Sequence, residues 1–445
     1  MAMSQIIKPK SISGFPEWLP AERYIELKWF DTIREIFESY GFCSIETPSV
    51  EALEVLTAKG EVDKEIYVIE RLHKEDGEKE ARLALHFDQT VPMARYVAQN
   101  FNELKFPFKR YQMQRVWRGE RPQAGRFREF YQCDIDVINV DNLPLYFDAE
   151  CPAIMVEILQ KLDIGSFKMQ LNNRKILAGF CQALGIDDFV PVTRIVDKLE
   201  KIGADNVKKQ LLTELSLSDA QANQILSFAS IKSSDDGFAK AVRDLGVSHP
   251  TLDEGIDELV FVINTLNNLV KGNFEVDMSI VRGLDYYTGT VYETRFTDAP
   301  SYGSICSGGR YEDLAGNYIN KKLPGVGISI GFSRLFDYIR AQGKLPKGRQ
   351  SPADMLIVLF DESQRLWAID LAKQLRNGEF LAAGRKMNVE IYHSATKLKK
   401  QLSYASEKGI PYVVFPPADP GGMPELKFMD DPDRAQEALT KLTGF

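Results

Sequence analysis

The sequence predicts an α+β protein, and three observations point to this fold class. Residues 115–137 read as two strands joined by a polar loop, whereas residues 173–268 lose strand signals and carry helical patterns instead. Residues 351–445 alternate strand and helix, as a small α/β domain does. We therefore expect a strand-rich core at 1–172 and 269–345, a helical insertion at 173–268 and a separate C-terminal α/β domain at 351–445.

Helices and strands alternate in the first part of the core. Apolar residues recur at helical spacing from Ile25 to Phe37, and Gly41 ends that helix. Residues 88–90, Asp-Gln-Thr, supply a cap for a second helix. The expected elements are helices at 20–40, 87–100 and 148–162 and strands at 42–48, 116–120, 126–137 and 168–171.

Within the helical insertion, Ser218 and Gln221 form a capping box at a helix start. Strand patterns resume at Phe274, and a Gly- and Pro-containing linker at 343–352 precedes the C-terminal domain, whose last segment, 416–428, is irregular. In the second part of the core we expect strands at 274–285, 286–296, 305–307 and 323–330 and a helix at 333–341. In the C-terminal domain we expect strands at 355–360, 388–392 and 412–415 and helices at 364–375 and 397–408.

The two strands around residues 121–125 carry the most informative pattern. Side chains alternate across a strand, so residues of the same parity share a face. On the outgoing strand Arg118 and Glu120 point together. One face of the returning strand carries Arg128, Phe130, Gln132, Asp134 and Asp136. At about 3.3 Å per residue, Phe130 and Asp136 lie up to about 20 Å apart, which spans a nucleotide joined end to end with a small polar molecule.

The chemistry of this row suits such a ligand. A guanidinium binds phosphate oxygens bidentately, an aromatic face stacks on a base, and a carboxylate accepts hydrogen bonds from an N–H-bearing group. The alternative is an amphipathic hairpin with a solvated basic face. The continuation of the row as Gln-x-x-x-Asp, after the basic residues stop, favours a binding site.

Composition limits the other possibilities. The length of 445 residues suggests about three domains. The net charge of −8 opposes general nucleic-acid coating, but residues 105–128 hold eight basic residues and one acidic one, enough to bind a polyanion locally. Five scattered cysteines without a C-x-x-C pair oppose both a disulfide framework and a structural zinc site. No N-terminal apolar segment and no 18-residue apolar run is present, so we expect a cytoplasmic enzyme with no membrane association.

Residues 280–293, IVRGLDYYTGTVYE, form a second candidate segment. Arg282 and Tyr287 have opposite parity, so both enter one pocket only if the strand is irregular, and Gly283 is the residue that permits a bend or bulge. Taken alone, the segment is more typical of a strand end with surface aromatic residues.

Two glycine-containing segments follow. Residues 323–334, LPGVGISIGFSR, lead into a helix with Arg334 in its first turn, where phosphates bind readily. Residues 307–311, SGGRY, read as a glycine turn that carries one arginine. This turn is either only a connection or a backbone wall against a ligand.

Together these segments resemble the class II aminoacyl-tRNA synthetases and, within them, the histidyl-tRNA synthetase family. Arg118-Gly119-Glu120 with Arg126-x-x-x-Phe130 resembles the second motif of the class, and residues 331–334, GFSR, resemble its third. The segment 282–293, Gln132 with Asp136, and SGGRY carry the histidine-specific likeness. The resemblance covers nearly the whole chain and implies an antiparallel sheet that binds ATP, with a C-terminal anticodon-binding domain.

The resemblance also implies roles. The enzyme would be a histidine–tRNA ligase: it would join L-histidine to ATP, with Mg²⁺ bridging phosphate oxygens and no metal site made of protein ligands only, and pass histidine to tRNA(His). Arg118 and Arg282 would be catalytic. The implied ATP-binding residues are Arg118, Glu120, Phe130 and Arg334. The implied histidine-binding residues are Asp88, Gln89, Thr90, Arg118, Gln132, Asp136, Arg282, Tyr286 and Tyr287. The candidates for tRNA contact are Arg121 and Gln123.

The chain departs from the family pattern at its entry segment, residues 14–20, at His86 and Phe87, and at Gln89 inside the Asp-x-Thr triplet. These departures concern the contacts of Asp88 and Thr90. Synthetases of this class are usually homodimers, and residues 19–50 would be the pairing element. Two non-enzymatic alternatives are a histidine-sensing regulatory subunit and a tRNA-sensing module. The regulatory subunit would be expected to lose residues 282–287, RGLDYY, and the C-terminal domain, both of which this chain has. The tRNA-sensing module would be expected to lose the catalytic arginines, whereas Arg118, Arg282 and Arg334 are all present.

Overall fold

The computed structural model describes residues 8–57, 66–72, 82–280, 287–313, 315–379, 384–419 and 422–429. The chain divides into two compact units. The first comprises Met1–Pro16 and Asp31–Gln342, and the second comprises Glu17–Phe30 and Gly343–Phe445.

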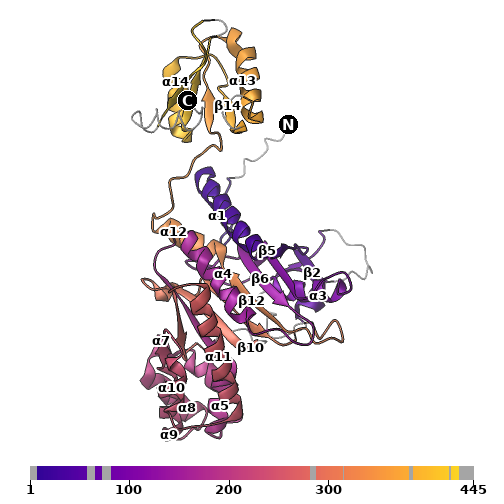
Figure 1. Ribbon diagram of the computed structural model, residues 1–445, viewed down its shortest axis with the longest axis vertical. Helices are drawn as coiled ribbons and strands as arrows, with labels where there is room; N and C mark the ends of the chain where they lie inside the picture. Colours follow the sequence, from indigo (N-terminus) through magenta and orange to yellow (C-terminus); the bar gives the residue numbers. More distant parts are fainter. Residues whose placement is uncertain are drawn as a thin grey trace. The chain divides into compact units, whose positions relative to one another are not determined.

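The first unit is built on a nine-stranded sheet (Figure 1). Six neighbouring strands in its middle pair antiparallel, and β1 and β9 join in parallel. In sheet order the strands are β1 (Cys43–Ser44), β5 (Phe108–Trp117), β6 (Glu129–Ile138), β12 (Gly325–Ile330), β11 (Cys306–Tyr311), β10 (Tyr287–Phe296), β7 (Phe167–Asn173), β9 (Phe274–Asp277) and β8 (Lys232–Ser233). The predicted α+β class with a mainly antiparallel sheet is confirmed.

Helices cover the middle of this sheet. The helix α4 (Phe147–Lys161) contacts β6, β11 and β12, and α12 (Phe332–Ala341) contacts β6 (Figure 1). The helix α3 (Thr90–Gln99) packs Met93 and Val97 with Ile138 of β6 and Tyr311 of β11. Because Ile138 has the parity of the polar row on β6, α3 lies on the face that carries this row.

A small three-stranded sheet precedes α3. It consists of β2 (Val50–Ala52), β4 (Leu83–Leu85) and β3 (Val68–Ile69), with the short helix α2 (Leu53–Thr57). Leu56, Ala84, Phe87 and Val91 form one buried cluster, which fixes the segment leading into α3. The helix α1 (Pro20–Ser39) buries Ile33 and Phe37, as its apolar spacing predicts.

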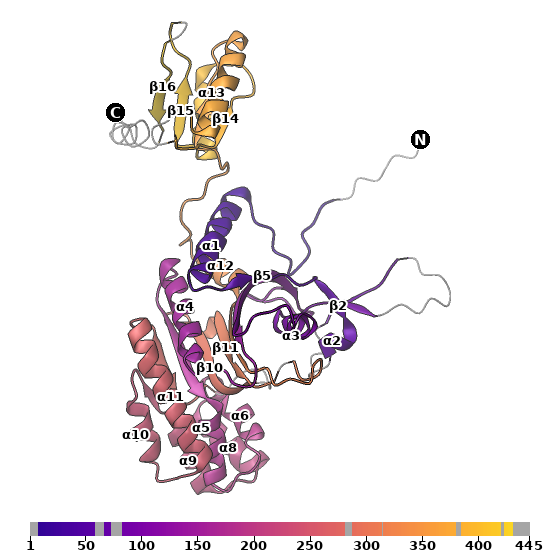
Figure 2. The same ribbon diagram turned by 45° about the vertical axis from the view of Figure 1, so that its right-hand side comes forward.

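The middle of the chain is helical, as predicted. Its elements are α5 (Arg174–Ala183), α6 (Val190–Val196), α7 (Leu199–Ile202), α8 (Ala204–Glu214), α9 (Asp219–Ala229), α10 (Gly237–Arg243) and α11 (Pro250–Leu269). The capping box of Ser218 and Gln221 at α9 is present. Helix α11 packs on α5 and α4, so these helices gather beside the β10–β7 side of the sheet (Figure 2). The strand β8 lies within this stretch and joins the main sheet, which the sequence pattern did not predict.

Several element boundaries differ from the prediction. The first strand of the hairpin is β5, which ends at Trp117 instead of spanning 116–120, and the returning strand starts at Glu129. The strand expected at 42–48 is reduced to β1. The segment SGGRY is not a turn but most of the central strand β11. A Cβ on Gly308 would lie 2.2 Å from the carbonyl oxygen of Gly327, so glycine here permits close packing of neighbouring strands.

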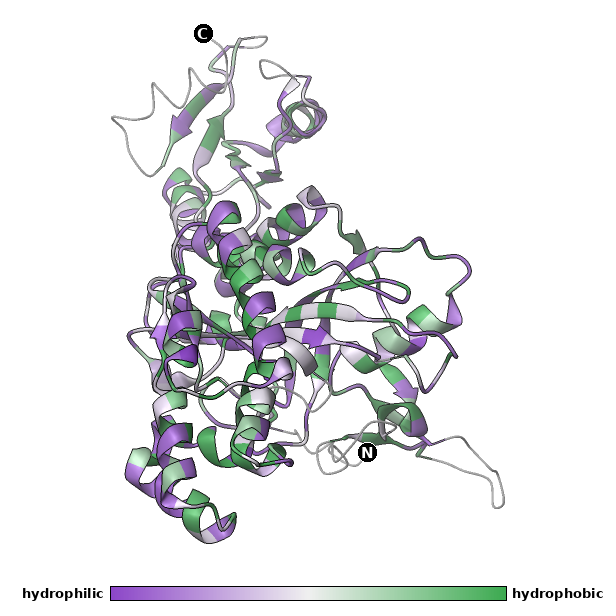
Figure 3. Ribbon diagram, turned by 60° about the horizontal axis from the view of Figure 1, so that its bottom comes forward, coloured by the Kyte–Doolittle hydropathy of each residue, from purple (hydrophilic) through white to green (hydrophobic). Residues whose placement is uncertain are grey.

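The second unit contains a four-stranded sheet in the order β14 (Val389–Ile391), β13 (Met355–Ile357), β15 (Tyr412–Phe415) and β16 (Glu425–Phe428). Helix α13 (Arg365–Asn377) covers one face and α14 (Leu398–Lys408) the other, each over its own buried cluster. The helices in Figure 3 carry both hydrophobic and hydrophilic residues, as expected of helices that bury one face. Two short 3-10 helices, η1 (Pro300–Tyr302) and η2 (Glu362–Gln364), complete the elements of the described residues. In this described part, no helix combines the length and the apolar character needed to cross a lipid bilayer.

Candidate functional site

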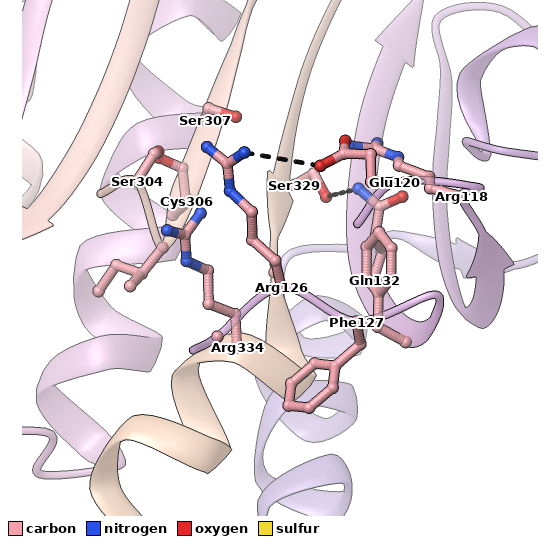
Figure 4. Close-up of a pocket in the computed structure, with 14 residues that line it drawn as sticks. Arg118, Glu120, Arg126, Phe127, Gln132, Ser304, Cys306, Ser307, Ser329 and Arg334 are labelled. Atoms are coloured by element: carbon pink, nitrogen blue, oxygen red, sulfur yellow. Dashed lines mark hydrogen bonds and ion pairs between the residues drawn. The ribbon is translucent and has the colours of Figure 1, made fainter. Parts of the chain in front are cut away.

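A cavity of about 280 Å³ lies on the polar face of the main sheet (Figure 4). The loop between β5 and β6, the strands β6, β11 and β12, and the start of α12 supply its walls. Its lining residues are Arg118, Glu120, Gly125, Arg126, Phe127, Phe130, Gln132, Ser304, Ile305, Cys306, Ser307, Ser329, Gly331 and Arg334. All four predicted ATP-binding residues, Arg118, Glu120, Phe130 and Arg334, therefore line one cavity, whose walls come from three separate segments of the chain.

A smaller recess of about 20 Å³ adjoins the cavity. It is lined by Thr90, Asp134, Asp136, Tyr287, Ser307, Tyr311, Gly327, Ile328 and Ser329. Ser307 and Ser329 line both spaces, so the recess continues the cavity along the polar row of β6. The row runs from Phe130 in the cavity, past Gln132, to Asp136 in the recess. The sheet thus provides a long site with an arginine-rich end and a carboxylate-rich end.

Arg118 follows directly after β5 and is fixed by the segment before α3. Its Nε donates a hydrogen bond to the carbonyl oxygen of Phe87 at 3.0 Å. Its guanidinium carbon lies 5.2 Å from the centroid of the Phe130 ring. The guanidinium is therefore held next to the aromatic face while its remaining N–H groups stay available to a ligand.

Two further arginines enter the same cavity. The guanidinium of Arg126 lies 3.6 Å from the carboxylate of Glu120, and Figure 4 shows Arg126 and Arg334 projecting side by side. Arg334 donates to the carbonyl oxygen of Tyr302 and lies over its ring, 5.1 Å from the centroid. Burial lowers the pKa of Arg334 because desolvation disfavours its charge, and an anionic ligand would reverse that cost.

Gln132 marks the transition from the cavity to the recess. Its Nε2 donates to the hydroxyl of Ser329 at 2.8 Å, and its Oε1 is buried with no partner among the described residues. The Gln89 amide donates to the carbonyl oxygens of Gln114 and Gln132, at 2.9 and 3.1 Å. Gln89 therefore ties α3 to β5 and β6 and lines neither space.

Asp136 is 3% exposed, and neighbouring strands hold both of its oxygens. Arg110, directly opposite on β5, forms an ion pair with one oxygen, and the Tyr311 hydroxyl donates to the other at 2.9 Å. Burial raises the pKa of Asp136, whereas Arg110 and the Tyr311 hydrogen bond act against the shift. We take the carboxylate to be ionised because a fully buried guanidinium lies against it.

Two more buried carboxyl groups lie near Asp136. Burial raises the pKa of Asp88 to about 6 and that of Asp134 to about 7. Gln89 is the N-cap residue of α3 and makes no side-chain capping bond, whereas Asp88 Oδ1, one residue earlier, accepts from the backbone N–H of Val91 at 3.2 Å. Asp88 Oδ2 has no partner among the described residues. Desolvation is the main cause of both shifts, and a cationic ligand beside either carboxyl group would favour its ionised form.

The remaining predicted residues are distributed unevenly. Thr90 and Tyr287 line the recess. Arg121 and Gln123 are exposed in the loop between β5 and β6 and do not line the cavity. Arg282, Gly283 and Tyr286 lie outside the described residues. The strand β10 does have an irregular register, but between Tyr287 and Val291.

The sequence interpretation missed Arg110, Tyr311 and Ser329 as parts of the site. These residues lie on β5, β11 and β12, and only the pairing of these strands brings them to the polar row of β6. Arg126 was seen in the second motif but received no role. Asp134 has the same parity as Asp136, which indicates that both side chains lie on one face of the strand, but no function was predicted for Asp134 from the sequence.

Gly327 gives a direct test of the recess. A Cβ on this residue would lie 1.9 Å from Oδ1 of Asp136, so Gly327→Ala must displace the carboxylate. We expect this variant to lose binding in the recess by at least roughly tenfold, because a misplaced buried charged partner costs more than one hydrogen bond, and to retain nucleotide binding in the cavity. Separate calorimetric titrations with a ligand of the recess and with a nucleotide measure the two affinities. Equal losses of both affinities would contradict the assignment of the recess.

Comparison with known proteins gives a consistent result. The family model described as histidyl-tRNA synthetase matches residues 14–335. The histidine–tRNA ligase of Thermobifida fusca is 56% identical over 428 residues, which is 96% of each chain, and that of Micrococcus luteus is 46% identical, covering 93% of this chain and 91% of the relative. The crystal structure of histidyl-tRNA synthetase from Nostoc sp. PCC 7120 has a TM-score of 0.85 at 39% identity and covers 98% of this chain and 100% of its own.

Proposed function

The chain belongs to the histidyl-tRNA synthetase family, and we propose that its two adjoining spaces carry out the histidine–tRNA ligase reaction, ATP binding in the cavity and L-histidine in the recess. The observation that carries this proposal is the continuity of the two spaces through Ser307 and Ser329. A ligand in one space meets a ligand in the other without leaving the sheet. Adenylate formation requires this contact between the histidine carboxylate and the α-phosphate.

ATP fits the arginine-rich end. Phe130 stacks on the adenine, Arg118 and Arg334 bind phosphate oxygens, and Glu120 lies by the adenine or by its neighbour Arg126. Support comes from the position of all these side chains in one cavity. Guanidinium groups match phosphate oxygens in geometry as well as charge.

Histidine fits the carboxylate-rich end. Gln132 and Arg282 hold the substrate carboxylate, Asp88 and Thr90 take the α-ammonium group, and Asp136 and Tyr287 bind the imidazole nitrogens, with Tyr286 lining the pocket. A recess built on buried polar partners rejects amino acids that lack a matching N–H by roughly 10⁴–10⁵. Selection at the recess therefore suffices without a separate editing site.

The chemical step needs positioning and charge neutralisation. A carboxylate oxygen of histidine attacks the α-phosphorus, the bond to the β-phosphate oxygen breaks, and pyrophosphate leaves. The attacking carboxylate is already anionic, so no protein base removes a proton. The arginines stabilise the charge that develops on the phosphoryl oxygens.

Mg²⁺ accompanies ATP in this proposal. Among the residues that line the cavity, Glu120 is the one carboxylate, and it lies 3.6 Å from Arg126. In the described residues no group of three or more His, Cys, Asp or Glu side chains is arranged to hold a metal. Mg²⁺ would be held mainly by the phosphate oxygens of ATP, where it would neutralise charge.

Arg282 provides the third cation at the reacting phosphorus. We expect Arg282→Ala to lower histidine-dependent ATP–pyrophosphate exchange by roughly 10²–10³ or more, because a charge at the transition state contributes at least as much as one oxyanion donor. Its far-ultraviolet circular dichroism should match that of the unchanged chain. Near-normal exchange in this variant would refute the catalytic role.

The second half-reaction transfers histidine to tRNA(His). The exposed loop residues Arg121 and Gln123 are candidates for contact with the acceptor end, and the α/β unit of residues 351–445 is the proposed anticodon-binding domain. We also propose a cytoplasmic homodimer paired through residues 19–50, which sedimentation velocity tests directly.

A histidine-sensing regulatory subunit is the second candidate. A structure titled as an ATP phosphoribosyltransferase regulatory subunit/histidyl-tRNA synthetase from Bacillus halodurans shares the fold, with a TM-score of 0.72, but at 20% identity it supports the fold alone. Arg118 and Arg334 both line the cavity here, which favours the enzyme. Charging of total tRNA with histidine tests the proposal, and an absence of charged product under conditions that support ATP binding would favour the regulatory subunit.

A further inference from the structure

The recess contains a carboxyl group that has no role in the reaction proposed above. Asp134 lies on β6 between Gln132 and Asp136, with the same parity, and it is 4% exposed. It lines the recess together with Thr90 and Asp136. Its Oδ1 is buried and has no hydrogen-bond partner among the described residues. An orphaned, buried carboxylate oxygen in a ligand space calls for a donor from the ligand.

The surroundings of Asp134 leave it more weakly paired than its neighbour. Ser329, its register partner on β12, acts to lower the pKa of the carboxyl group, but burial outweighs this effect. Arg110 acts on Asp134 only at a distance, because its ion pair is with Asp136. Asp136 and Asp88 add negative charge nearby. Asp134 therefore faces two carboxylates and shares one guanidinium that is already engaged.

We propose that Asp134 is a second carboxylate for the α-ammonium group of histidine, which it binds opposite Asp88 and Thr90. This inference rests on the proposed function. Alternate residues of a strand lie about 6.6 Å apart, so Asp134 falls between the residue that holds the substrate carboxylate, Gln132, and the residue that holds the imidazole, Asp136. The carbon that bears the ammonium group occupies that middle position in histidine itself.

The ammonium group would supply hydrogen-bond donors to oxygens that have no partner among the described residues. It brings three N–H donors and one positive charge. Asp88 Oδ2 and Asp134 Oδ1 are the two buried carboxylate oxygens without partners in the described part of this site. Binding of the cation favours the ionised form of both carboxyl groups, so histidine binding releases protons and tightens as the pH rises through their pKa values, about 6 and about 7.

Three ligands separate this role from a structural one. L-Histidine and histidinol carry the ammonium group, whereas 3-(imidazol-4-yl)propanoate keeps the imidazole and carboxylate but lacks it. We expect Asp134→Asn in the full chain to lower the affinity for histidine and for histidinol by roughly 10- to 100-fold, because one charge-assisted hydrogen bond is lost. The affinity for the propanoate should change by no more than about twofold. Asp136→Asn is the matched control, because it should weaken all three ligands.

The outcomes are distinct. Equal losses of all three ligands in Asp134→Asn, or no loss of histidine and histidinol, would overturn the proposal. Failure of the unchanged chain to bind any of the three ligands would instead count against the proposed function. Should Asp134→Asn not fold, proton release at pH 7.5 is measured with saturating ligand in a chain that carries Asp88→Asn, in which Asp88 cannot contribute. Greater release with histidine than with the propanoate supports the role of Asp134, and equal release contradicts it.

Discussion

Replacement of Arg118 by alanine is expected to reduce histidine-dependent ATP–pyrophosphate exchange by roughly 10³ or more, because it removes a cation from the phosphate end and the partner of Phe130. The guanidinium lies 5.2 Å from the Phe130 ring centroid and donates to the Phe87 carbonyl. The loss should appear in the rate at saturating substrates as well as in nucleotide affinity. Rapid-quench measurement of adenylate formation separates the two.

Arg115→Ala is the matched control. Arg115 lies on β5, three residues before Arg118; its side chain is 47% exposed, and it pairs with Glu129 at 3.1 Å, outside the cavity. A surface ion pair of this kind contributes about 0–1 kcal/mol to folding. Exchange by Arg115→Ala should stay near that of the unchanged chain. Equal losses in the two variants would show that general positive charge, not the position of Arg118, supports the reaction.

Replacement of Asp136 by asparagine is expected to weaken histidine binding by roughly 30-fold or more, since removal of one partner of a buried charge pair costs about 2–5 kcal/mol. ATP affinity should change little, because Asp136 does not line the cavity. Unchanged histidine affinity by calorimetry would reject the imidazole assignment.

This variant also leaves Arg110 as a buried charge without its carboxylate. We therefore expect a lower melting temperature. Arg110→Met combined with Asp136→Asn removes that charge and should recover part of the stability without recovering histidine affinity. Recovery of affinity in the double variant would show that the original loss came from folding alone.

The polar row of β6 was predictable because strand parity is a local property of the sequence. Cys133, Ile135 and Val137 are fully buried on the opposite face, as the alternation requires. The alternative prediction, an amphipathic hairpin with a solvated basic face, is wrong for the end of the row, because Asp134 and Asp136 are buried. This burial depends on α3 and the neighbouring strands, which the hairpin sequence does not encode.

The length of β5 was not predictable from the same pattern. Arg110, Gln112 and Gln114 occupy one face of this strand and are buried, so the usual contrast between polar exposed and apolar buried positions fails there. Their partners come from distant segments: Gln112, for example, donates to the Thr47 hydroxyl at 3.0 Å. Register across strands, which pairs Arg110 with Asp136, follows only from the assembled sheet.

Glycines misled the prediction on β11 for a related reason. In a sequence, Gly-Gly is typical of a turn. Here Gly308 and Gly309 lie within a central strand, and a Cβ on Gly309 would come within 2.8 Å of the Tyr287 ring. The residues keep space for neighbouring groups instead of reversing the chain.

The recess beside the nucleotide cavity is proposed to select histidine for adenylation, and the roles assigned to its residues all depend on that selection. ATP–pyrophosphate exchange measured separately with each of the twenty amino acids tests it most directly. We predict exchange with L-histidine and at most about 10⁻⁴ of that rate with any other amino acid. Comparable exchange with an amino acid that lacks an imidazole, or none with histidine, would contradict the assignment of the recess.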